Sequence, residues 1–296
     1  MPPATLRGCI NVVAVVVLLL TSACASVGKQ APTGKDAEAQ QYLQTGMAAA
    51  QKGQHELALS EYVKGLAAQP RNAELHFRVA ESQVAIGKTS EAAVTYRRVL
   101  GLQPDHAGAL QGLGLLLLKQ GQYEPATKLL TRSVELDPTS WRSLNGLAAI
   151  ADLKRDYAQA RDYYNRAVAL QPNSPVLLNN LGYSRYLAGS LSDARSYFEQ
   201  ALRIDPQYGQ AWRNLGLVMA RQGQLREAVR AFSQTMPEAE AAYTTGYVCM
   251  LENRLADAQS MFQRAIDLSP SYYPDAEDAL ARVKTLRSDL RSEGEP

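Results

Sequence analysis

The chain has 296 residues, of which 46% are hydrophobic and 20% charged, a composition typical of a protein that folds around apolar cores. Its 31 Lys and Arg residues nearly balance its 29 Asp and Glu residues, so the formal charge is only +2. This balance excludes the long-range positive field that collects nucleic acid, and no nucleic-acid partner is expected.

Residues 1–23 have the pattern of a bacterial lipoprotein signal peptide. Arg7 supplies the positive charge, and the apolar run over residues 10–20 is too short to span a bilayer, which takes about 20 apolar residues. The segment Leu20-Thr21-Ser22-Ala23-Cys24 resembles a lipobox, which implies cleavage before Cys24 and lipidation of its thiol. The alternative is an ordinary signal-peptidase site at Ala23-Cys24-Ala25, which would release a soluble periplasmic protein.

Residues 24–38 are small, polar and interrupted by Pro and Gly, and are predicted to form the lipidated cysteine and a flexible tether. No Asp stands beside Cys24, which resembles the sorting signal of outer-membrane lipoproteins. The protein is therefore expected on the periplasmic face of the outer membrane, held there by lipid.

A period of 34 residues then runs through the chain. Small residues and large apolar residues recur in register, as in the pairs Ala160 with Tyr164 and Ala194 with Phe198. Proline closes each unit, at Pro70, Pro104, Pro138, Pro172 and Pro206. The period predicts seven repeats, at residues 39–72, 73–106, 107–140, 141–174, 175–208, 209–238 and 239–272.

These columns and their spacing resemble the tetratricopeptide-repeat (TPR) family. The resemblance implies an all-α, right-handed solenoid of helical hairpins, with residues 273–296 forming a capping helix and tail. Glycine stands at most predicted turns, but repeat four has Arg155 and repeat seven has Asn253. The step from Gly216 to Gly246 is 30 residues, so the second helix of repeat six is expected to be about one turn short.

No catalytic, cofactor or metal site is expected. The sequence has no phosphate-binding glycine loop, no nucleophile elbow and no metalloprotease motif, and its three histidines are far apart. Cys249 falls where the repeat pattern places a packing residue, so we expect it to be structural. The chain is interpreted as a non-enzyme that binds other proteins.

The TPR resemblance implies a concave groove lined by the first helix of each repeat. In the family, the second, fifth, ninth and twelfth positions of a repeat face this groove. Tyrosine is common at these positions in repeats five to seven, and tyrosine can stack on and hydrogen-bond to a peptide. Packing between adjacent helices is the alternative role for these rings. The expected partner-binding residues are Asn179, Tyr183, Tyr186, Arg213, Tyr243 and Tyr247.

The residues from Leu178 to Val218, together with the stretch from Gly246 to Ala276, resemble the TadD-type lipoproteins of the tight-adherence (Flp pilus) secretion apparatus. This resemblance implies a pilotin-like role, with the secretin and other pilus-assembly components as partners. Two alternatives remain open: a lipoprotein scaffold for peptidoglycan hydrolases or other envelope complexes, and an enzyme whose site is positioned by the repeats.

Overall fold

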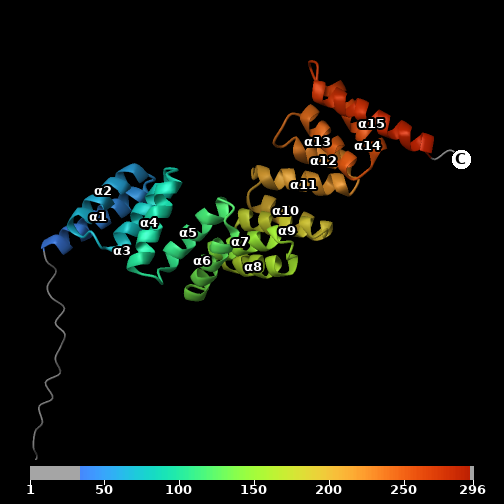
Figure 1. Cartoon of the computed structure of the whole chain (residues 1–296). Helices are drawn as coiled ribbons and strands as arrows, with labels where there is room; N and C mark the ends of the chain where they lie inside the picture. Colours follow the sequence, from blue (N-terminus) through green and yellow to red (C-terminus); the bar gives the residue numbers. More distant parts are fainter. Residues whose placement is uncertain (1–33, 294–296) are drawn as a thin grey trace, which may run out of the picture.

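The computed structural model describes residues 34–293, which fold into helices joined by short turns, with no strand in this range (Figure 1). The predicted signal peptide, Cys24 and most of the predicted tether lie outside the described residues. The helices are α1 (Gly34–Gln51), α2 (His55–Ala68), α3 (Ala73–Ala85), α4 (Thr89–Leu102), α5 (Ala107–Lys119), α6 (Tyr123–Leu136), α7 (Trp141–Leu153), α8 (Tyr157–Leu170), α9 (Pro175–Leu187), α10 (Leu191–Ile204), α11 (Gly209–Arg221), α12 (Leu225–Phe232), α13 (Glu238–Leu251), α14 (Leu255–Leu268) and α15 (Pro274–Glu293).

The helices are arranged as seven hairpins in a row, followed by a single helix. Each odd-numbered helix from α1 to α13 packs against the helix that follows it, and α15 packs against α14. The first helices of neighbouring hairpins also contact one another from α3 to α13. Figure 1 shows the result, an elongated array with α1 and α15 at opposite ends. The predicted all-α solenoid with a C-terminal capping helix is confirmed. None of the helices in residues 34–293 combines the length and the apolar character that a bilayer-spanning helix needs.

Close contacts between small and large residues hold each hairpin together. A Cβ atom added to Gly182 would lie 2.7 Å from Cε1 of Phe198, a distance that real Cβ contacts do not reach. Ala160, Ala194 and Phe198 have no solvent exposure. Glycine and alanine thus let the two helices approach until the aromatic ring fills the space between them.

The turns inside the hairpins use the left-handed backbone conformation. Arg155 and Asn253 have φ values of 61° and 55° and occupy the place that glycine takes in the other turns. Arg155 carries a conformational cost that glycine avoids, because a Cβ atom crowds the backbone there.

The first helix begins earlier than predicted, so the assignment of residues 34–38 to the tether is wrong. Helix α1 begins at Gly34, and Asp36 lies in its first turn, where a negative charge interacts favourably with the helix dipole. The Asp36 carboxylate also accepts a hydrogen bond from the Gln69 side chain at the end of α2. This contact joins the first turn of α1 to the end of its partner helix.

Helix α12 is shortened more than the sequence predicted. It has eight residues, whereas the other second helices have 14. Beyond its end, the Ser233 hydroxyl donates to the Val229 carbonyl at 2.8 Å and the Thr235 hydroxyl donates to the Phe232 carbonyl at 3.1 Å. The Val229 carbonyl also accepts the Ser233 backbone amide at 2.9 Å, so the hydroxyl bond accompanies the last helical bond and does not replace it.

The capping helix buries apolar residues only in its first half. Ala276, Leu280 and Val283 are buried, but Leu286 is 40% exposed. Helix α15 has 20 residues and α14 has 14, so α15 extends past the surface that it covers.

Candidate functional site

The first helices of repeats five, six and seven form a continuous surface. These helices are α9, α11 and α13, and α11 contacts both of the others. We call their solvent-facing side the inner wall. The second helices of successive hairpins form no comparable contact, so the first helices lie on the inside of the curve.

Two tyrosines and an arginine meet on this wall. Tyr183 is 41% exposed, and its ring stacks on that of Tyr186 with centroids 6.0 Å apart and planes 20° apart. The Arg221 guanidinium of the next repeat lies over the Tyr186 ring, 5.1 Å from its centroid. Arg221 in turn pairs with Glu252, with Nε 2.9 Å from Oε1. The structure therefore brings Tyr183 and Tyr186 together, and Arg221, paired with Glu252, contacts the Tyr186 ring.

Burial and charge act on the Tyr186 hydroxyl in opposite directions. Burial raises its pKa, and the neighbouring Arg221 guanidinium lowers it. The net pKa is raised above that of a free tyrosine, so the hydroxyl stays protonated at neutral pH. It is available there as a hydrogen-bond donor.

Arg213 and Tyr247 lie further along the wall. Tyr247 is 44% exposed. Arg213 is exposed and forms no ion pair within the described part of the chain. Both side chains are exposed, and their role in binding a partner stays a prediction.

Asn179 does not face solvent. It is 1% exposed, and its side-chain Oδ1 accepts a hydrogen bond from Asn214 Nδ2 at 2.8 Å. Its own amide donates to Asn180 Oδ1 at 3.4 Å, and Asn180 donates to Asn145 Oδ1 at 2.9 Å. We call Asn145, Asn180, Asn179 and Asn214 the amide chain. It joins α7, α9 and α11, so the role of Asn179 here is to hold repeats together.

Tyr243 also packs between helices. Its ring centroid lies 5.5 Å from that of Phe262 in α14 and 5.6 Å from that of Tyr273 just before α15. Burial raises its pKa. The alternative role foreseen for the tyrosines, packing between adjacent helices, is the one that these contacts support for Tyr243.

Three residues of the wall were missed in the sequence. Leu187, Arg221 and Leu251 are the last residues of α9, α11 and α13, and the two leucines are 39% and 67% exposed. They share the thirteenth position of their repeats, one place beyond the positions that the family pattern assigns to the groove. Their shared position at the end of a first helix, one residue beyond the last groove position, was the available signal.

A buried carboxylate lies close to the wall, between repeats four and five. The Ser184 hydroxyl donates to Asp152 Oδ1 at 2.7 Å, and both residues are buried. Burial raises the pKa of the Asp152 carboxyl, while hydrogen bonds from Ser184 and Tyr164 act in the opposite direction. No cation pairs with Asp152 among the described residues.

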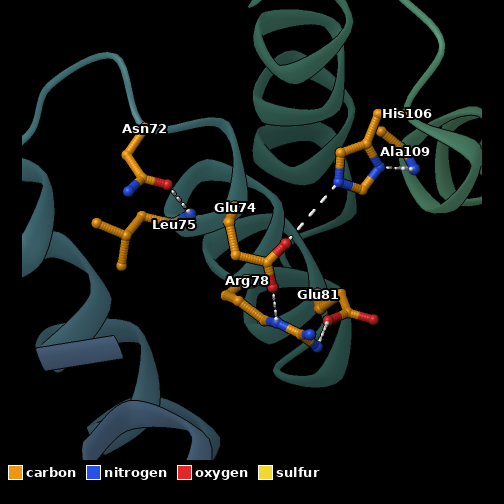
Figure 2. A network of polar contacts seen from close by, with 7 residues as sticks. All are labelled: Asn72, Glu74, Leu75, Arg78, Glu81, His106 and Ala109. Atoms are coloured by element: carbon orange, nitrogen blue, oxygen red, sulfur yellow. Dashed lines mark hydrogen bonds and ion pairs between the residues drawn. The ribbon is translucent and has the colours of Figure 1, made fainter. Parts of the chain in front are cut away.

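Figure 2 shows a second polar cluster, at the junction of repeats two and three. Arg78 donates to Glu74 at 2.7 Å and to Glu81 at 2.8 Å. His106 caps α5 by accepting from the Ala109 amide at 3.1 Å, and its other ring nitrogen lies 4.0 Å from Glu74. The polar groups of this cluster bond to one another. The cluster therefore joins repeats two and three and carries no reactive group.

Nothing in the described residues has the arrangement of a reactive centre. Cys249 is fully buried, and burial raises the pKa of its thiol to about 11, so the nucleophilic thiolate is scarce at neutral pH. Within the same residues no group of three or more His, Cys, Asp or Glu side chains could hold a metal ion. The geometry supports binding by stacking, hydrogen bonds and apolar contact.

Comparisons with known proteins identify the repeats. Two family models, both described as tetratricopeptide repeat, match residues 43–107 and 111–175 and residues 185–244, and together they cover more than half of the chain. No curated protein sequence matches the chain.

Solved structures share the fold. The protein described as Pseudomonas aeruginosa pilF is 22% identical with a TM-score of 0.57, and the match covers 78% of this chain and 99% of that one. A tetratricopeptide-repeat protein from Parabacteroides merdae is 14% identical with a TM-score of 0.57, over 84% of this chain and 99% of that one. The Cut9-Hcn1 hetero-tetramer of the APC/C is 18% identical with a TM-score of 0.58, over 77% of this chain and 48% of that one. These structures show the fold alone; the two family models, with the period of 34 and the paired helices, show that the chain belongs to the tetratricopeptide-repeat family.

Proposed function

We propose that the protein is an envelope-anchored scaffold that assists assembly of a Flp/Tad-type pilus secretion apparatus, with its inner wall as the partner-binding surface. Tetratricopeptide repeats imply a protein–protein interaction scaffold, and both family models that match the chain describe this repeat. The pilus role rests on the resemblance of residues 178–218 and 246–276 to TadD-type lipoproteins. The anchor rests on the lipobox ending at Cys24.

The observation that carries the binding surface is the exposed aromatic and apolar strip on the inner wall. Tyr183 and Tyr247 are each more than 40% exposed, and Leu187 and Leu251 add exposed apolar area at the helix ends. Tyr183 is held rigid by its stacking on Tyr186, so little side-chain entropy is lost when a partner covers it. Rigid aromatic anchors of this kind contribute much of the binding energy in protein interfaces.

The test of the wall is the double substitution Tyr183→Ala with Tyr186→Ala. Each ring is worth on the order of 1 to 2 kcal/mol in a desolvated contact, so binding should weaken about a hundredfold. The measurement is a crosslinking pull-down from native envelopes, followed by titration of the captured secretin-apparatus components. Tyr272→Ala is the matched control, because Tyr272 is 72% exposed and lies off the inner wall.

Circular dichroism melts of the same variants separate binding from folding. Tyr183→Ala alone should melt like the parent protein, because that ring is exposed. Full binding by a folded double variant would contradict the inner wall as the binding surface. Capture of peptidoglycan hydrolases in place of secretin components would contradict the pilus role and support the alternative scaffold.

Lipid anchoring has its own test. Cys24→Ser should leave the protein out of the membrane fraction, because acyl chains contribute about 0.8 kcal/mol per buried methylene and no other anchor is expected. Cys9→Ser is the control, since the predicted cleavage removes Cys9 with the leader. A Cys24→Ser protein that stays with the outer membrane after a salt wash would contradict lipidation as the attachment.

A further inference from the structure

A hollow of about 660 Å³ lies on the outer side of repeats six and seven, beside the point where α12 ends early. Val229 of α12 lines it, together with Ser233 and Gln234 of the following turn and Glu238 at the start of α13. The charged lining comes mainly from three arginines: Arg226, Arg230 and Arg264. Helices α12 and α14 are second helices, so this hollow is separate from the inner wall.

Two of these arginines have no internal partner. Arg226 and Arg230 stand one helical turn apart on α12 and are exposed, and neither forms an ion pair within the described residues. Arg264 differs, because its Nη2 donates to Glu238 Oε1 at 2.7 Å. The lining thus holds three positive charges and one negative charge, and two of the positive charges are unpaired.

Arg264 connects this hollow to a second one. It also lines an adjacent hollow of about 480 Å³ between α14 and α15, with Lys284 and Arg287 on one side and Asp267 on the other. Both hollows carry more positive than negative side chains. They form a basic track along the outer side of repeat seven, within a chain whose overall charge is almost zero.

We infer that this basic track is a second docking surface, which binds an acidic segment of a partner protein. Arginine presents its donors as a planar fork that matches a carboxylate, and unpaired forks one turn apart suit successive acidic side chains. A protein segment fits better than a membrane surface, because the track is at the opposite end of the array from the N-terminal helix that leads to the proposed lipid anchor (Figure 1). The inference does not depend on the inner wall.

The experiment is a fluorescence anisotropy titration of the full-length protein in mild detergent, with labelled hexaglutamate as the probe and hexaglutamine as the neutral comparison. Arg226→Gln with Arg230→Gln should weaken hexaglutamate binding about tenfold, equivalent to about 1.4 kcal/mol. Added salt should weaken binding to the parent protein, because the contacts are exposed. Tyr183→Ala with Tyr186→Ala should leave this binding unchanged, so the two surfaces are tested separately.

The control is Arg161→Gln with Arg203→Gln, which removes two exposed, unpaired arginines from α8 and α10 and changes the net charge equally. An equal loss of hexaglutamate binding in both double variants would overturn the inference, because binding would then depend on net charge and not on a defined site. Equal binding of hexaglutamate and hexaglutamine would overturn it as well. Displacement of hexaglutamate by millimolar glycerol phosphate but not by glutamate would assign the track to lipid headgroups instead.

Discussion

Alanine at Gly182 tests the closest helix approach in repeat five. The new Cβ atom would lie 2.7 Å and 2.9 Å from two ring carbons of Phe198 and 3.1 Å from Cβ of Tyr197. Phe198 is fully buried, so its ring cannot swing away. Overpacking of this kind costs about 1 to 3 kcal/mol, and the higher helix propensity of alanine returns at most about 1 kcal/mol. We expect a net loss of about 0 to 2 kcal/mol in the free energy of unfolding.

Gly101→Ala is the matched control, because Gly101 is also helical but a Cβ atom added there would meet no other atom within 4 Å. Its free energy of unfolding should rise by up to about 1 kcal/mol, from the higher helix propensity of alanine alone. The assay is urea unfolding followed by circular dichroism, with a check that the denaturant dependence is unchanged. Phe198→Val, which lacks the ring edge, should make Gly182→Ala behave like the control, with a coupling energy of about 1 to 3 kcal/mol. Equal gains at Gly182 and Gly101, or additive effects in the double variant, would refute the close approach.

Two further substitutions follow from local geometry. Arg155→Gly should stabilise repeat four by about 1 kcal/mol, because Arg155 has a φ of 61° that glycine adopts freely. Asn253→Gly should stabilise the protein less, because asparagine tolerates this conformation. Equal shifts in melting temperature for the two variants would contradict the argument. Asp152→Asn should raise the melting temperature at neutral pH. Burial raises the pKa of the Asp152 carboxyl in the folded state, so this carboxyl stabilises the fold most when it is protonated. That stabilisation is lost as the pH rises through the folded-state pKa. The gain should disappear below about pH 4, where Asp152 is protonated in both states, and a gain that is independent of pH would refute the assignment.

The sequence predicts most of the fold because the same local interactions recur in every repeat. Small residues opposite large ones, positive-φ turns and terminal prolines recur at fixed spacing, and each is readable without knowing distant contacts. The two errors in helix length lie where the repeat period gives no information. Asp36 makes the first turn of α1 favourable despite the glycine before it, and α12 ends at Phe232, before the proline that the sequence offers as its stop at Pro237.

The proposed binding surface was harder to predict, because the exposure of a side chain depends on neighbouring residues that its position in the repeat does not identify. Asn179 stands at a groove position, yet Asn214 of the next repeat covers and bonds to it. Tyr243 is covered by Tyr273, which belongs to the segment before the capping helix and not to a repeat. Tyr183 has no such neighbour in front of it and stays exposed. Position within the repeat gives the direction of a side chain, but only the packed array shows what lies in front of it.

The amide chain gives the array a mechanical property. Each hairpin contacts mainly its neighbours, so a pulling force between a membrane anchor at one end and a partner near the other would pass through every interface in series. Between repeats four and six, the bonds from Asn180 to Asn145 and from Asn214 to Asn179 must break before the first helices separate. A hydrogen bond weakens steeply when its geometry is distorted, so these bonds fix the relative position of the first helices. The next interface is also tied by polar contacts, from Arg221 to Glu252 and from Arg254 to the Ala220 carbonyl, so a pulling force would meet polar bonds from repeat four to repeat seven.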